Sequence, residues 1–212
     1  MQKSTTLFLL ISFTLLVLLN SCGSNPVRQM NEKAVDTKIY NAPYFSNAAI
    51  DYVYKANIAV YGNELSGIFI VKKLNETTHR VVFTTEFGNK LMDFEISDSD
   101  FKVNSIVEEL DRKILINTLK KDFRILLKKT YVVEKQFEDD HNIIYESKMG
   151  RSYNYLYLSK TGGGLLKIVH ASKRKEKIIV YCTSENNIFA EKIVIQHQNI
   201  KLRIELNYFN NQ

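Results

Sequence analysis

The chain is poor in cysteine and proline. It has 212 residues, of which two are cysteines (Cys22 and Cys182) and two are prolines (Pro26 and Pro43). After residue 22 the only cysteine is Cys182, so no disulfide can form within the rest of the chain, and a disulfide scaffold is excluded. Cys182 alternates with Ile178 and Val180, a pattern that predicts a buried thiol on a β-strand.

Motifs of catalysis and metal binding are also missing. No serine or cysteine nucleophile stands in a recognisable setting, and Gly162-Gly163-Gly164 lacks the Lys-Ser/Thr that follows in a phosphate loop. Glu138-Asp139-Asp140 is typical of a solvated turn. The histidines fall on different predicted strands or turns without ligand-like spacing: His79, His141, His170 and His197. We therefore expect a protein that is not an enzyme and uses no metal or other cofactor.

One long apolar run is present, at the N-terminus. Leu7 to Leu19 is apolar except for Ser12 and Thr14, and it follows a short start that carries Lys3, which is the layout of an export signal. The run is shorter than the roughly 20 residues of a membrane-spanning helix. Leu19-Asn20-Ser21-Cys22 resembles the lipobox of bacterial lipoproteins. This resemblance implies a signal peptide over residues 1–21, cleavage before Cys22 and a covalent lipid on the Cys22 thiol. The alternative is an uncleaved signal anchor with an incidental cysteine.

The remainder divides into two parts. Residues 22–50 hold both prolines, are mostly polar and show no sustained apolar period, so we expect a tether. Residues 51–212 are long enough for one domain with its own core. Neither Gly23 nor Ser24 is acidic. In well-studied Gram-negative bacteria an Asp after the lipidated cysteine retains a lipoprotein in the inner membrane. Its absence favours the outer membrane, with the domain on the periplasmic side.

The charge balance is basic. The formal net charge is +6, and it becomes +5 once Lys3 leaves with the signal peptide. Nucleic acid is not the expected partner of an exported protein, whereas anionic lipid head groups suit this charge. The densest basic cluster, 173–177, lies between two apolar runs and predicts a charged hairpin tip.

After residue 50 the sequence consists of short β-favouring runs separated by turn residues, which is typical of an antiparallel sheet or barrel. The last run is the clearest, because Ile200, Leu202 and Ile204 alternate with polar residues. Eleven strands are predicted: 52–61, 65–73, 79–86, 90–96, 130–137, 142–149, 153–159, 165–171, 177–183, 188–197 and 200–209.

One segment breaks the β pattern. Apolar residues from Ser105 to Asp122 recur at helical spacing, and Ser105 and Glu108 have the spacing of a capping box. Several strands are apolar on both faces, so the sheet needs cover on both sides or a cavity on one. The expected fold is mainly β: a curved antiparallel sheet or half-open β-barrel of about eleven strands. An amphipathic helix at 105–122 lies on its concave side, with Leu110 and Ile114 facing that side.

The stretch 56–96 resembles the LolA/LolB superfamily of lipoprotein carriers, and its LolB-like members in particular. Ala56-Asn57-Ile58-Ala59-Val60 is similar to the Gly-Arg-Leu-Ala-Val opening strand of that family. Glu86-Phe87-Gly88-Asn89-Lys90-Leu91 stands where LolB-like proteins carry Pro-Leu-Gly-Gln-Thr-Leu. The resemblance implies a half-open barrel with an apolar cavity for acyl chains. It also implies that Phe87 takes the place of an exposed leucine needed to deliver cargo.

Two hypotheses follow. In the first, the protein takes acylated lipoproteins from a periplasmic LolA-like carrier and helps insert them into outer-membrane lipid. In the second, it is a non-catalytic binding or structural lipoprotein of the envelope with the same fold and another ligand. An acyl-binding cavity favours the first hypothesis, and a packed core without a cavity favours the second.

Overall fold

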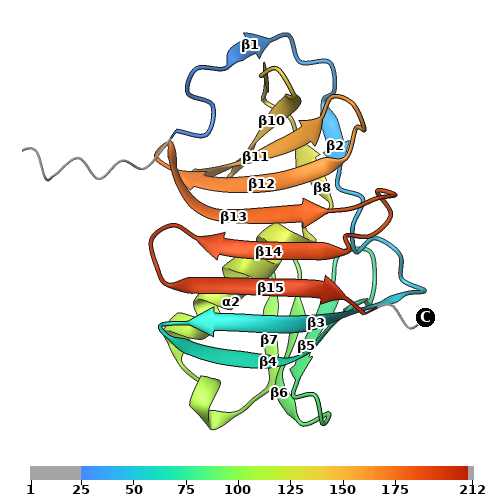
Figure 1. The fold of residues 1–212 in the computed structure, drawn as a ribbon, viewed down its shortest axis with the longest axis vertical. Helices are drawn as coiled ribbons and strands as arrows, with labels where there is room; N and C mark the ends of the chain where they lie inside the picture. Colours follow the sequence, from blue (N-terminus) through green and yellow to red (C-terminus); the bar gives the residue numbers. More distant parts are fainter. Residues whose placement is uncertain (1–24, 210–212) are drawn as a thin grey trace, which may run out of the picture.

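The computed structural model describes residues 25–209; the expected signal peptide and Cys22 lie outside the described residues. Thirteen strands of this part form one antiparallel sheet in the order β1-β9-β10-β11-β12-β13-β14-β15-β3-β4-β5-β6-β7. Two short strands, β2 and β8, form a separate ribbon. Figure 1 shows the sheet curling from β1 at one end of the molecule to β4 and β6 at the other.

Most strands are hairpin partners of their neighbours in sequence, because short turns separate them. The first half of the chain contains β1 (Asn31–Lys33), β2 (Ile39–Asn41), β3 (Asp51–Val60), β4 (Asn63–Lys73), β5 (His79–Thr84), β6 (Lys90–Ile96) and β7 (Phe101–Ile106). A 3-10 turn, η1 (Glu108–Leu110), and the helix α2 (Lys113–Leu127) follow. The second half contains β8 (Thr130–Val132), β9 (Lys135–Glu138), β10 (Asn142–Met149), β11 (Ser152–Ser159), β12 (Leu165–Ser172), β13 (Lys175–Thr183), β14 (Lys192–His197) and β15 (Leu202–Tyr208).

The predicted fold class is confirmed: the sheet is antiparallel, curved and open, with β1 and β7 at its two edges. β15 joins the two halves by pairing with β3, from Leu202 opposite Val60 to Tyr208 opposite Tyr54. The alternation at 200–209 predicts this last strand well, because one of its faces is buried and the other is solvated.

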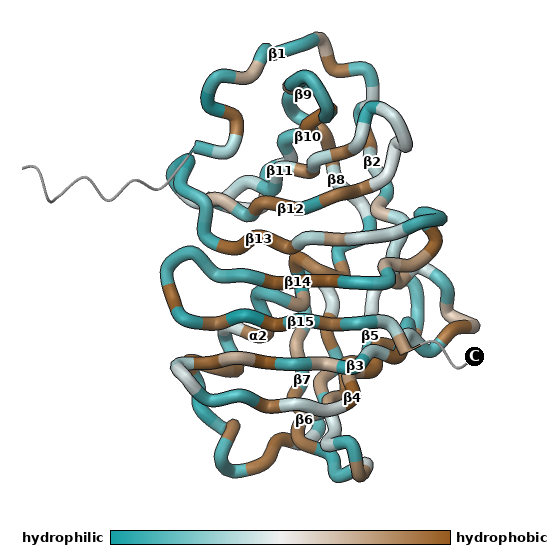
Figure 2. The backbone as a smooth tube through the Cα atoms, viewed as in Figure 1, coloured by the Kyte–Doolittle hydropathy of each residue, from teal (hydrophilic) through white to brown (hydrophobic). Residues whose placement is uncertain are grey.

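The main core lies between the concave face of the sheet and α2. Alternate residues of the strands point into it, such as Tyr54 and Ile58 from β3 and Phe69 from β4. The helix contributes Leu119 and Phe123, whose ring lies 5.3 Å from that of Phe69. Figure 2 shows the hydrophobic residues concentrated in the middle of the strands, while the turns are largely hydrophilic.

A second, smaller core lies on the other face of β9 to β13, where Tyr155, Tyr157 and Val169 are buried. The N-terminal segment covers it: Val27 and Met30 pack against this cluster, and the Tyr157 hydroxyl donates to the Pro26 carbonyl at 2.6 Å. This cover explains why these strands are apolar on both faces. Part of the segment that the sequence predicts to be a tether therefore buries the second face of these strands.

The prediction of a tether over 22–50 is therefore wrong for its later residues. β1 pairs with β9, β2 pairs with β8, and Phe45 is buried in the main core. The His79 Nε2 lies 2.9 Å from the Phe45 carbonyl, which can only accept, so the imidazole donates. Strands of three residues are too short to show an apolar period, which is why the sequence pattern misses them.

Two further predictions need correction. The helix does not begin at Ser105, which is paired with Asp93 as part of the edge strand β7; it begins at Lys113 and ends at Leu127. The single predicted strand 130–137 is two strands, β8 and β9, which pair with different partners. The first error involves the edge strand β7, where exposed residues weaken the β pattern.

Candidate functional site

A pocket of about 890 Å³ opens at one end of the concave face, beneath the first turns of α2. Its walls come from the β3–β4 hairpin, the β14–β15 hairpin and the segment from η1 into α2. The apolar part of the lining is Val60, Tyr61, Leu65, Leu110, Ile114, Leu115, Ile200 and Leu202. Charged residues stand among them, including Glu64, Arg112 and Lys113. The volume lies within the roughly 300–1,000 Å³ of small-molecule sites, and the apolar part of the lining suits a hydrocarbon chain.

Both residues predicted for the cavity helix line this pocket, although they occupy different elements. Leu110 belongs to η1, where it is half-buried and packs on the main core. Ile114 lies in the first turn of α2 and is 80% exposed. An isoleucine this exposed beside an apolar pocket leaves hydrophobic surface in water. Contact of either residue with an acyl chain stays a prediction.

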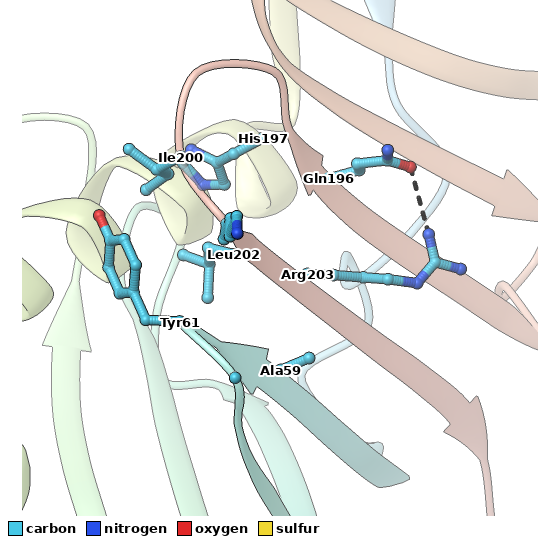
Figure 3. A pocket seen from close by; sticks show the side chains of 9 residues that line it. Ala59, Tyr61, Gln196, His197, Ile200, Leu202 and Arg203 are labelled. Carbon is cyan, nitrogen blue, oxygen red and sulfur yellow. Dashed lines mark hydrogen bonds between the residues drawn. The ribbon is translucent and has the colours of Figure 1, made fainter.

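Tyr61 and Ile200 come from neighbouring hairpins and also line two shallower hollows at this end of the sheet. Figure 3 shows their side chains at the same end as His197 and away from the hydrogen-bonded pair Gln196 and Arg203. Tyr61 is 64% exposed and has a left-handed backbone, with φ at 49°. A bulky residue in that region is rare and costs free energy, so an exposed tyrosine at this turn marks a candidate functional position.

Phe87 lies in the loop between β5 and β6 and is 93% exposed. The loop is ordered by its own backbone: the Gly88 N–H donates to the Thr85 carbonyl at 3.0 Å, and Gly88 takes a left-handed φ of 85°. Because β5 runs antiparallel to β4, the loop follows the end of β5 that is nearer the start of β4, where Thr84 pairs with Ile68. Its role in insertion stays a prediction.

Asp93 fixes the base of this hairpin. Its buried carboxylate accepts bonds from Arg80 Nε and Nη2 at 2.9 and 2.6 Å, and from Lys90 Nζ at 2.8 Å. Asn104 of β7 donates to the same carboxylate at 3.2 Å. The Arg80 guanidinium beside it is the main reason that the pKa of Asp93 lies well below its usual range. The cluster ties β5, β6 and β7 together directly behind the loop that exposes Phe87.

A row of buried polar residues crosses the concave face, and the sequence reasoning did not find it. The strand registers place Ser147, Asn154 and His170 opposite one another on β10, β11 and β12; Ile178 follows on β13 and His197 on β14. His170 Nδ1 lies 2.8 Å from the Asn154 amide oxygen. Burial lowers the pKa of His170 to about 4, with a smaller effect from Lys121. Read one at a time, the two histidines look like ordinary strand residues; only strand pairing brings them into one row.

Cys182 is buried on β13, and burial raises its pKa to about 12, so its thiol is protonated at neutral pH. Among residues 25–209 no group of three His, Cys, Asp or Glu side chains is arranged to hold a metal ion. No helix within the same range is long and apolar enough to span a membrane. Cys22, the predicted lipidation site, lies outside this range.

Comparison with solved structures identifies the fold. A LolA superfamily protein from Nitrosomonas europaea superposes with a TM-score of 0.50 at 11% identity, over 80% of this chain and 88% of that chain. A domain assigned to outer membrane lipoprotein sorting in Vibrio parahaemolyticus gives 0.44 at 7%, over 76% and 83%. A DUF1329 family protein from Desulfovibrio piger gives 0.41 at 10%, over 76% and 84%. No protein-family model and no curated protein matches the sequence. The fold is LolA/LolB-like, as the resemblance at 56–96 predicts.

Proposed function

We propose that this chain is a membrane-anchored lipoprotein that binds acyl chains in the pocket beneath α2. In this proposal it takes acylated lipoproteins from a periplasmic LolA-like carrier and helps insert them into the outer membrane. The observation that carries it is the pocket of about 890 Å³, whose lining is mostly apolar, at the open end of a LolA/LolB-like sheet. Burial of apolar surface is non-directional, so such a pocket accepts acyl chains of any attached protein.

The exposed ring of Phe87 supports the same role. Transfer of a lipid from a protein to a bilayer requires the pocket to approach the membrane. Inserting an exposed phenylalanine contributes about 1.5–3 kcal/mol. That is too little to anchor a protein but enough to favour one orientation. A lipid on Cys22 would provide the anchor itself; two or more acyl chains hold a protein stably, whereas one does so only marginally.

Binding and transfer of this kind need no chemistry, so we propose that the chain is not an enzyme and needs no cofactor. Cargo would move down a gradient of affinity, from carrier to receptor to bilayer. His79, His197, Asp93 and Asp122 are hydrogen-bonded within the fold, and His170 is bonded through Nδ1 to Asn154.

One observation favours the second hypothesis, a binding or structural lipoprotein with another ligand. The C-terminal half of α2 fills the middle of the concave face, where Leu119, Phe123 and Ile125 are buried. The pocket is thus confined to one end of the sheet. A closed centre limits the length of chain that the pocket can shield, and a smaller ligand would suit it equally well.

Depletion of the protein in its native host separates the two. If it delivers lipoproteins, other lipoproteins should accumulate in the inner membrane or the periplasm as the protein is lost. A plasmid copy of the gene should restore their normal distribution. Unchanged distribution of lipoproteins after complete depletion would reject the delivery role and leave the second hypothesis.

A further inference from the structure

The hairpins at the two ends of the β10–β15 region carry opposite charge. Because successive hairpins of an antiparallel meander alternate between the ends, the loops 150–151, 173–174 and 198–201 lie at one end. Their charged residues are Arg151, Lys173, Arg174 and Lys201, all basic and all exposed. The loops of the opposite end, 139–141, 160–164 and 184–191, contain Asp139, Asp140, Glu185 and Glu191 against one basic residue, Lys160.

The basic end is also where the described chain begins. In Figure 1 the first described residues lie on the left of the sheet, the side of the β14–β15 and β3–β4 hairpins, and the C-terminus lies on the right. Cys22 precedes Asn25 by only three residues, which reach at most about 11 Å when extended. The segment that follows is fixed to the sheet through the Tyr157–Pro26 hydrogen bond and the packing of Val27 and Met30. An anchor on Cys22 would therefore hold this side of the domain close to the bilayer.

Lys173 and Arg174 occupy a turn in which their backbone conformation is strained. Both residues have left-handed backbones, with φ at 51° and 59°, as a two-residue hairpin turn of type I′ requires. Asn-Gly is the sequence that adopts this turn most easily, and other residues are strained in the left-handed region. Strain of this kind persists where the side chains serve a function. Tyr61 occupies a similarly strained, exposed position at the same end, and tyrosine is enriched where proteins meet a membrane surface.

We propose that this basic end, defined by Arg151, Lys173, Arg174 and Lys201, rests on an anionic lipid surface and orients the anchored domain. This inference rests on the proposed lipid anchor at Cys22. It adds which surface of the domain contacts the bilayer and that the contacted lipid is anionic. In this orientation the mouth of the pocket faces the bilayer, because Tyr61 and Ile200 belong both to the pocket and to the basic end. The acidic end then faces the aqueous side, where repulsion from anionic head groups keeps it.

The test uses the lipidated full chain on vesicles that carry a spin-labelled quencher at the head-group level. A fluorophore is attached through Asn199→Cys at the basic end or through Asp140→Cys at the acidic end, both exposed positions. On vesicles of equal parts phosphatidylglycerol and phosphatidylcholine, the label at 199 should be quenched and the label at 140 should not. On phosphatidylcholine alone the difference should shrink.

The decisive variant is Lys173→Asn with Arg174→Gly, which removes two charges and relaxes the turn. Each basic residue near an anionic surface shifts such an equilibrium about fivefold, so losing two should reduce the oriented population roughly 25-fold relative to other orientations. The variant should unfold at an equal or higher temperature, which excludes misfolding as the cause. The matched control, Lys102→Gln with Lys129→Gln, removes the same charge from two other exposed sites and should leave quenching unchanged.

The outcomes separate the inference from the proposed function. Binding to the vesicles themselves is measured by flotation in a density gradient. A chain that floats with neither kind of vesicle refutes the anchor, and with it the proposed function. A chain that floats with both kinds, but whose two labels are quenched equally or whose difference survives the Asn-Gly variant, overturns the orientation by this basic end alone.

Discussion

His197 and Asp122 join the sheet to the helix: the imidazole Nε2 lies 2.9 Å from both carboxylate oxygens, and both side chains are buried. Because an ionised carboxylate only accepts, Nε2 donates its hydrogen to it. Burial raises the pKa of Asp122, and the bond from His197 opposes that rise. The contact connects β14 with the middle of α2, the element whose first turns cover the pocket.

Asp122→Ala should therefore destabilise the fold by roughly 3 kcal/mol, because it leaves a buried donor without its acceptor. Asp122→Asn keeps an acceptor oxygen and should cost less. Urea unfolding of both variants measures the difference. Equal stability of Asp122→Ala and the parent chain would mean that this contact does not hold α2 on the sheet.

His170 should make the protein sensitive to acid. Its folded pKa is lowered to about 4 from the ordinary 6.5, so the unfolded chain binds the proton first as pH falls. The stability contributed by neutral His170 is fully present above pH 6.5 and is lost as the pH falls to about 4. The shift corresponds to a loss on the order of 3 kcal/mol.

Burial also lowers the pKa of His79, which adds to the loss in the same direction. The free energy of unfolding, measured by urea between these pH limits, should fall less steeply for His170→Gln than for the parent chain. His141→Gln is the control, since His141 is exposed. Parallel curves for the parent chain and His170→Gln would contradict the assignment.

Asp93→Ala should loosen the hairpin that presents Phe87. It removes the acceptor shared by Arg80, Lys90 and Asn104, and we expect a loss of roughly 1–3 kcal/mol. Amide hydrogen exchange should rise in β5 and β6 more than in β12 and β13. Unchanged exchange in β5 and β6 would show that backbone pairing alone holds this hairpin.

Phe87→Glu should leave the fold intact and impair delivery. The side chain is almost wholly exposed, so the free energy of unfolding should change by no more than about 0.5 kcal/mol. Transfer of an acylated lipoprotein from a carrier to vesicles should fall several-fold. The control is Ile188→Glu, since Ile188 is also exposed, at 62%, but lies in a loop at the opposite end of the sheet. A stable Phe87→Glu protein that delivers cargo at the normal rate would refute the role of this residue.

The sequence predicts the parts of the fold in which local pattern and tertiary burial agree. Strands such as β15 alternate clearly, and Phe87 stands out because glycine and a short polar turn surround an aromatic residue. β7 was missed because its residues between Phe101 and Ile106 are exposed at the sheet edge, so their apolar neighbours fitted a helical period equally well. The row from Ser147 to His197 depends on strand register, which no local pattern contains.

Photo-crosslinking shows directly whether the pocket beneath α2 holds acyl chains. A lipopeptide with a photoreactive group at the end of one acyl chain is incubated with the lipidated protein, irradiated and mapped by mass spectrometry. We expect adducts on the pocket lining, at Leu110, Ile114 or Ile200, which a Leu65→Trp variant that fills the pocket should abolish. Adducts confined to the outer face of the sheet, or equally abundant in Leu65→Trp, would contradict it.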